Sequence, residues 1–122
     1  WKTQELIRKI LHNQYKATPD GLGGNDDCGQ MSAWYIFSAL GFYPVAPGSD
    51  EYQIGSPIIN NATFNLESGK QLKITVQNQS ETNKYVKSVS VNGRLLTGTV
   101  IKHADIMNGG EMIFVMMNKH PK

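Results

Sequence analysis

The most informative stretch of the sequence is GNDDCGQMSAWYIFSAL, residues 24–40, where an acidic loop leads directly into an apolar run. The run predicts a helix from about Cys28 to Leu40, and its apolar residues cover nearly every helical face. Asp27 stands where an N-cap is expected, with Gln30 at capping-box spacing, and Gly41 suits the position after the last turn. A helix of this kind is buried on all sides, and a chain of 122 residues can hardly surround it. We therefore expect further sequence to cover it.

The residues before this stretch predict an amphipathic helix and a turn. Pro19 disfavours the helical conformation at Thr18, so the helix must end before it. Residues 21–27 then form a glycine-rich acidic loop. Apolar side chains recur at helical spacing before the turn, at Leu6, Ile7, Ile10, Leu11 and Tyr15.

The sequence after Tyr43 changes to short segments in which apolar and polar residues alternate. This alternation predicts strands at 63–66, 71–76, 85–91 and 112–116. Hairpin turns are expected at Ser68-Gly69 and Asn92-Gly93, and a helical turn at 103–108. Alternation indicates one buried and one solvated face, as in an antiparallel sheet. The predicted fold class is α+β, with two N-terminal helices followed by an antiparallel, sandwich-like sheet from about Tyr52.

The composition excludes several classes of function. Twelve basic and ten acidic residues give a net charge of +2, which is too balanced to indicate a nucleic-acid or membrane partner. The single cysteine, Cys28, excludes an internal disulfide, and we expect it to be a small buried residue. His12, His103 and His120 lack the spacing of metal ligands. The aromatic residues of 34–37 are interpreted as core rather than as a platform for sugar.

The acidic loop is the one segment with residues suited to catalysis. Adjacent carboxylates at Asp26 and Asp27 repel each other unless a cation, a helix dipole or water relieves them. Such a loop suits a general base, or, with Asn25, oxygen ligands for a hard cation such as calcium. The alternative is purely structural, with Asp27 as a helix cap and Asn25-Asp26 as a turn. On composition alone the structural interpretation is favoured, because turns use these residues constantly.

Several further segments continue the pattern of residues 24–35. They are LGFYPV at 40–45, PG at 47–48, Tyr52, GSP at 55–57 and HADIMNGG at 103–110. Together they resemble the C-terminal signature of glycoside hydrolase family 92, over essentially the whole chain. The string of acidic and aromatic residues at 24–35 is far more specific to this family than a pair of aspartates.

The resemblance implies a fold and an activity. Members of the family are calcium-dependent, inverting exo-α-mannosidases, often bacterial, with an N-terminal β-sandwich joined to an (α/α)6 barrel and a β-rich tail. On that template, residues 1–45 are the last barrel helices with the acidic loop at 21–27, and residues 46–122 are the C-terminal antiparallel β region. We expect the chain to be part of a larger protein that cleaves α-1,2-mannosides. Its expected location is the periplasm, the cell surface or the extracellular space.

The resemblance also assigns roles to the loop. Asp26 and Asp27 match the base-side aspartates, and which of them is the base stays open. Asn25 and Asp27 are the expected calcium ligands, while the general acid, a glutamate, lies outside this chain. The expected partners are a mannose-containing glycan and the upstream part of the same polypeptide, with neither nucleic acid nor membrane. The isolated chain is predicted to be inactive and to self-associate through its helices. The alternative is a non-catalytic carbohydrate-binding or structural β module.

Overall fold

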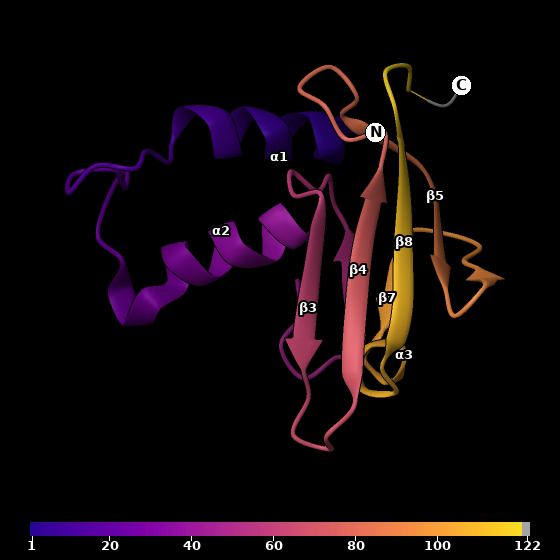
Figure 1. The fold of residues 1–122 in the computed structure, drawn as a ribbon. Coiled ribbons are helices and arrows are strands. Elements are labelled where there is room, and N and C mark those ends of the chain that lie inside the picture. The colour runs from indigo at the N-terminus through magenta and orange to yellow at the C-terminus, as the bar shows by residue number, and fades with distance from the viewer. Residues whose placement is uncertain (121–122) are drawn as a thin grey trace.

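The computed structural model describes residues 1–120, in which two long helices project from one side of a pair of β-sheets (Figure 1). Helix α1 spans Lys2–Asn13, and helix α2 spans Gln30–Leu40 after a short 3₁₀ turn, η1, at Asp27–Gly29. A third, short helix, α3, spans His103–Met107. The loop between α1 and α2 lies at the end of the helical pair farthest from the sheets (Figure 1). The predicted class, helices followed by a β region, is confirmed.

The strands form two sheets. The smaller has the order β1-β2-β7 and is antiparallel throughout, from Phe42–Tyr43, Glu51–Ile54 and Val100–Lys102. The larger has the order β3-β4-β8-β5-β6, from Asn61–Asn65, Gln71–Gln77, Gly110–Met117, Tyr85–Val91 and Arg94–Leu95.

The larger sheet is mixed rather than purely antiparallel. Strand β8 lies between β4 and β5, and it pairs parallel with β4 and antiparallel with β5. A strand inserted between these two neighbours can be antiparallel to only one of them, because β4 and β5 run in opposite directions on the two sides of β8. The chain reaches this position through β7 of the smaller sheet and α3.

The core lies between the two sheets and the C-terminal end of α2. The alternation predicted for residues 71–76 is confirmed, since Leu72 and Ile74 have no exposed surface while Gln71 and Lys73 are exposed. Strand β8 contributes Met112, Phe114 and Met116 in the same manner. The opposing side chains come from the end of α2 and from the smaller sheet, namely Leu40, Phe42, Ile54 and Ile101.

The sequence predicts the long strands well and the short ones poorly. Strand β5 coincides with the predicted 85–91, and β3, β4 and β8 differ from prediction by one or two residues at their ends. The turn at Asn92-Gly93 has positive φ at both residues, 49° and 79°, as a tight hairpin turn requires. Strands β1, β2, β6 and β7 are too short for a clear period. The division at residue 45 stays a prediction, and β1 and β2 pair across it.

Helix α2 is not buried on all sides within residues 1–120. Its last three residues, 38–40, are buried, but Ile36 is 58 % exposed and Tyr35 is also exposed, while Trp34 and Phe37 are half-buried. On α1, Leu6 is 59 % exposed. The expectation that this chain does not itself cover the helices therefore holds for Leu6 and Ile36, and less fully for Trp34 and Phe37.

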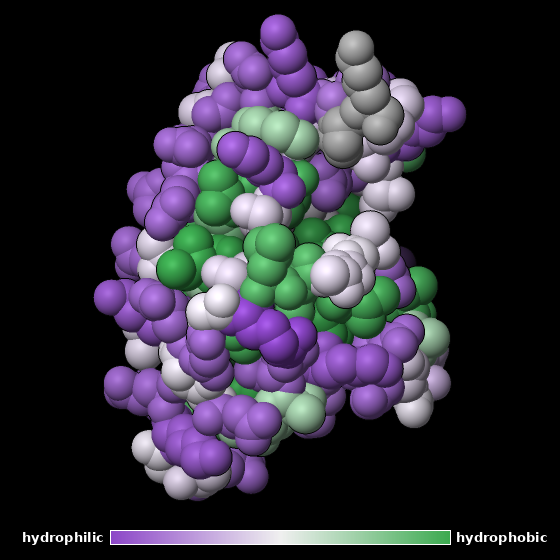
Figure 2. Space-filling view, turned by 90° about the vertical axis from the view of Figure 1, so that its right-hand side faces the viewer, coloured by the Kyte–Doolittle hydropathy of each residue, from purple (hydrophilic) through white to green (hydrophobic). Residues whose placement is uncertain are grey.

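The side of the molecule away from the helical loop also carries apolar surface. Figure 2 shows apolar side chains in the middle of this face, surrounded by hydrophilic ones.

Within residues 1–120, no helix has the length and apolarity to span a bilayer.

One side chain of α1 fastens the helix to the β region. Arg8 donates to Ser56 Oγ at 2.8 Å and to the carbonyl of Pro57 at 2.7 Å, and both of these residues are fully buried. It also donates to the carbonyls of Ser80 and Asn83, each at 3.2 Å. The guanidinium thus donates to three loop carbonyls, those of Pro57, Ser80 and Asn83, which lie outside the strands. Together with the bonds that Gln4 and Glu5 accept from Val86 and Tyr85, this contact joins α1, and with it the start of the acidic loop, to the β region.

Candidate active site

The acidic loop begins with a tight closure just after α1. Tyr15 and Leu22 form an isolated antiparallel bridge, and the amide of Lys16 donates to the carbonyl of Gly21 at 3.0 Å. A Cβ at position 21 would lie 1.9 Å from the carbonyl oxygen of Lys16, so only glycine fits there. The closure leaves residues 23–29 to bridge the distance to α2.

Asp26 caps the first turn of α2. Its Oδ1 accepts from the amides of Met31 (2.7 Å) and Ser32 (3.1 Å), and its Oδ2 accepts from the hydroxyl of Ser32 at 2.6 Å. The hydroxyl of Ser32, then its amide, and also the amide of Met31, hold the pKa of Asp26 below its ordinary value, against a smaller opposing effect of burial. Asp26 is therefore an ionised, fully engaged carboxylate and a weak proton acceptor.

The predicted capping role of Asp27 is wrong. Asp27 opens the 3₁₀ turn η1, and the residues after it, Cys28 and Gly29, have left-handed φ values of 55° and 72°. These two residues redirect the chain, so α2 begins at Gln30 with Gly29 at its N-cap and without the predicted capping box. Cys28, which was expected to be buried, is exposed on this turn.

Asp27, the residue after Asp26, is exposed. Among residues 1–120 it has neither a hydrogen-bond donor nor an ion-pair partner. The two adjacent aspartates thus differ in kind. Asp26 has three hydrogen bonds that hold α2 and the loop together, and Asp27 is available to a water, a cation or a ligand.

The structure offers part of a calcium site but not a complete one. Asn25 is exposed like Asp27, and its side chain has no hydrogen bond within residues 1–120. Calcium takes six to eight oxygen ligands, and Asn25 and Asp27 supply hard oxygens of the correct type. Within residues 1–120, no three His, Cys, Asp or Glu side chains gather as a metal-binding group. The two side chains fit calcium only as a minority of its ligands.

An aromatic cluster supports the loop from the side of the helices. The ring of Tyr15 stacks on Trp34 at 5.7 Å between centroids and contacts Tyr35 at 4.9 Å. A cavity of about 410 Å³ opens beside this cluster, lined by residues that include Leu22 and Ser32. Phe37 instead packs against the aromatic residues of the β region. The interpretation of residues 34–37 as core is therefore correct for Phe37, whereas Tyr35 lines an open cavity.

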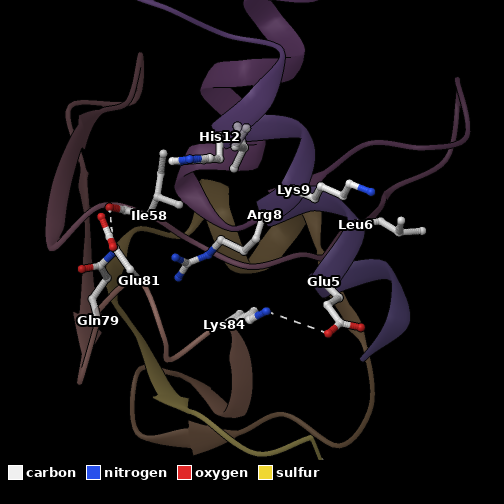
Figure 3. A pocket seen from close by; sticks show the side chains of 10 residues that line it. Glu5, Leu6, Arg8, Lys9, His12, Ile58, Gln79, Glu81 and Lys84 are labelled. Carbon is white, nitrogen blue, oxygen red and sulfur yellow. Dashed lines mark hydrogen bonds and ion pairs between the residues drawn. The ribbon is translucent and has the colours of Figure 1, made fainter.

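A larger cavity, of about 860 Å³, lies between α1 and the segment 79–84 (Figure 3). Figure 3 shows charged side chains of both signs around it, among them Glu5, Arg8, Glu81 and Lys84. Lys84 and Glu5 form a weak ion pair at 3.9 Å across it. No residue of the acidic loop lines this cavity, so its size does not make it part of the candidate site.

Two of the three histidines, His103 and His120, contact aromatic residues. Nδ1 of His103 lies 3.0 Å from the hydroxyl of Tyr52, and the ring of His120 stacks on Trp1 at 4.6 Å.

Two residues that hold the acidic loop, Tyr15 and Ser32, were not predicted as functional. Ser32 lies within the recognised string 24–35, while Tyr15 read only as one member of an apolar stripe.

The comparison with known families matches the whole acidic loop and the β region together. Residues 1–118 match the family model described as the glycosyl hydrolase family 92 catalytic domain. The chain therefore belongs to glycoside hydrolase family 92. Because the model is that of a catalytic domain, the match favours the enzyme over the non-catalytic β module.

Similar proteins are known from a bacterium and a fungus. A family GH92 α-mannosidase of Bacteroides thetaiotaomicron, solved with mannoimidazole, is 48% identical with a TM-score of 0.91, over 98% of this chain and 16% of its own. An inverting mannosidase of the same family and organism is 37% identical with a TM-score of 0.88, over the same shares. An uncharacterized secreted glycosidase of Arthroderma benhamiae is 28% identical over 84% of this chain and 14% of its own length. The chain thus spans less than one fifth of each relative.

Proposed function

We propose that this chain supplies the base side of the active site of a calcium-dependent, inverting exo-α-mannosidase that removes α-1,2-linked mannose from glycans. Membership of family 92 supports glycoside hydrolysis. The similar structures support mannose as the sugar, since one is an α-mannosidase solved with mannoimidazole and another is an inverting mannosidase. The secreted fungal relative supports an extracytoplasmic location.

The contrast between the two aspartates carries the proposal and assigns their roles. A general base must be free to take a proton, and it must be able to contact the attacking water. Asp27 is exposed and has no partner within residues 1–120, whereas Asp26 is held by three hydrogen bonds that lower its pKa. We therefore assign Asp27 as the general base and Asp26 as the residue that holds the loop on α2.

The mechanism of inversion gives Asp27 its task. An inverting glycosidase places two carboxyl groups about 6.5–9.5 Å apart, with a water molecule on the side of the base. Asp27 accepts a proton from this water as the water oxygen attacks the anomeric carbon. A carboxylic acid on the opposite side of the sugar protonates the leaving oxygen, and we expect this acid to be a glutamate outside the present chain. Because Asp26 and Asp27 are neighbours in one loop, we expect them to serve only the side of the base.

The same loop is proposed to contribute to calcium binding. Asn25 and one oxygen of Asp27 are the candidate ligands, and the remaining ligands must come from water, substrate or other parts of the full-length protein. Bound calcium supplies a positive charge that orients the hydroxyl groups of mannose. The loop presents these two oxygens. The bridge between Tyr15 and Leu22 closes its start, and Asp26 joins its end to α2.

The test uses the full-length protein with α-1,2-mannobiose. Asp27→Asn keeps the shape of the side chain but cannot accept the proton, so kcat should fall by about 10²–10⁴-fold. Asp20→Asn, an exposed aspartate of the same connection, is the matched control and should keep wild-type activity. Proton NMR of the first product should show β-mannose, and a chelator should abolish turnover until calcium is restored.

Three outcomes would contradict parts of the proposal. If Asp27→Asn remains active while Asp26→Asn does not, the assignment of the two roles is wrong. If both variants keep wild-type kcat, the loop is structural. Equal rates on α-1,2-, α-1,3- and α-1,6-mannobiose would refute the proposed linkage specificity alone.

A further inference from the structure

A continuous line of hydrogen bonds connects Tyr15 with Asp26. The hydroxyl of Tyr15 donates to the carbonyl of Met31 at 3.0 Å. That carbonyl and the amide N–H of Ser32 belong to one peptide group. The same N–H donates to Oδ1 of Asp26 at 3.1 Å. A side chain at the start of the connection between the helices is thus linked, through a single peptide group, to the aspartate that precedes the proposed base.

We infer that Tyr15 is a positioning residue for the acidic loop, and that it acts through the Met31–Ser32 peptide group and Asp26 to place Asp27. The inference rests on the proposed function of Asp27. Tyr15 itself does not contact the reacting atoms in this assignment, so it is not a catalytic residue.

The surroundings of Tyr15 make it suitable for this role. Its ring is half-buried and contacts the rings of Trp34 and Tyr35, with centroid distances of 5.7 and 4.9 Å. Its backbone pairs with Leu22, at the beginning of the glycine-rich segment. Tyr15 therefore contacts both ends of the loop: its backbone closes the N-terminal end, and its hydroxyl reaches the first turn of α2. An aromatic ring with two torsions, in contact with two other rings, has little freedom to move.

The physical coupling is directional. A hydrogen bond to a peptide carbonyl polarises the peptide group and strengthens the bond that its N–H donates. Burial, followed by the charge of Asp26 and the proximity of Tyr43, raises the pKa of Tyr15, so its hydroxyl stays protonated and remains a donor. Without that donor, the Met31–Ser32 peptide group donates a weaker hydrogen bond to Oδ1 of Asp26, and the carboxylate of Asp26 is held less firmly. Asp27 is the next residue, and its placement changes accordingly.

The test compares two tyrosine-to-phenylalanine substitutions in the full-length protein. Tyr15→Phe keeps the stacked ring and removes only the hydroxyl. Tyr85→Phe is the matched control, because the buried Tyr85 also donates one hydrogen bond of 3.0 Å, to Glu5 Oε1, away from the loop. We expect Tyr15→Phe to lower kcat about 10- to 100-fold with KM unchanged, since displacement of a base weakens the transition state alone. Tyr85→Phe should keep wild-type kcat.

A second measurement reports the position of the loop without activity. Hydrogen exchange of residues 23–32 should be about two- to tenfold faster in Tyr15→Phe than in wild type, and unchanged in Tyr85→Phe. Ser32→Ala, which removes the hydroxyl bond to Oδ2 of Asp26, should accelerate the same exchange and also lower kcat. Its effect on kcat should combine with that of Tyr15→Phe less than multiplicatively, because both act on Asp26.

The outcomes separate this inference from the proposed function. Equal kcat and equal loop exchange in Tyr15→Phe and Tyr85→Phe would overturn the role of Tyr15. Full activity of Asp27→Asn would instead overturn the proposed base, and loop exchange would then still decide whether Tyr15 positions the loop. Both the role of Tyr15 and the proposed base are supported if Tyr15→Phe and Ser32→Ala show faster loop exchange and a lower kcat while Tyr85→Phe shows neither.

Discussion

Replacement of Arg8 by methionine should weaken the attachment of α1 to the β region and cost about 3 kcal/mol of unfolding free energy. Methionine keeps the apolar stem of the side chain and removes only the guanidinium. The loss therefore measures the hydrogen bonds rather than the packing of α1. Burial lowers the pKa of Arg8, yet the guanidinium remains charged at any pH at which the protein folds.

The magnitude follows from the four acceptors. Two bonds are short, 2.8 Å to Ser56 Oγ and 2.7 Å to the carbonyl of Pro57, and end on fully buried residues. Each buried acceptor that loses its donor costs about 1–1.5 kcal/mol. The bonds to Ser80 and Asn83 are longer, at 3.2 Å each, and are weighted at about 0.5 kcal/mol apiece. Ser56 keeps its own bond to the carbonyl of Lys84. The total loss of unfolding free energy should therefore lie near the lower end of the sum of these four contributions, at about 3 kcal/mol.

The assay is urea unfolding at low protein concentration, followed by far-UV circular dichroism. With a slope of about 1.5–2 kcal/mol/M, the midpoint should fall by about 1.5–2 M. Arg94→Met is the control: Arg94 pairs with Asp105 at 2.6 Å, but its side chain is 61 % exposed, so the loss should stay below about 1 kcal/mol. Equal midpoint shifts in the two variants would refute the reasoning from buried acceptors.

Three further predictions concern the loop, the helices and the isolated chain. The pKa of Asp26 is lower in the folded than in the unfolded state, so its stabilisation is complete above its unfolded pKa of about 3.9 and is lost as pH falls through the folded value. Acid titration should show the unfolding free energies of wild type and Asp26→Asn converging only at low pH. A constant difference between the two would contradict this. The exposed Leu6 and Ile36 should make the isolated chain self-associate, and lysine at both positions should reduce its mass in light scattering, whereas a wild-type monomer at high concentration would argue against the apolar contact. Purified residues 1–122 should not hydrolyse α-mannosides, because the reaction needs a second carboxyl group on the opposite side of the sugar; calcium-dependent turnover by this chain would disprove it.

Local chemistry is what the sequence by itself determined. Strands β4, β5 and β8 were predictable because alternate residues of a strand face opposite sides, so one buried face leaves a period of two. The turn at Asn92-Gly93 and the end of α2 at Gly41 were predictable because positive φ favours these residue types. The string of residues 24–35 also indicated the family, which the comparison confirmed.

Partners in space were decided only by the tertiary structure. A period of two states which face of β8 is buried, but not that β8 lies between β4 and β5 and runs parallel to β4. The roles of Asp26 and Asp27 were undetermined for a similar reason. Both residues are good caps in sequence, and the left-handed backbone at Cys28 and Gly29 directs the carboxylate of Asp26 to α2 while it leaves that of Asp27 exposed. Cysteine has no intrinsic preference for that conformation, so no local rule predicts it.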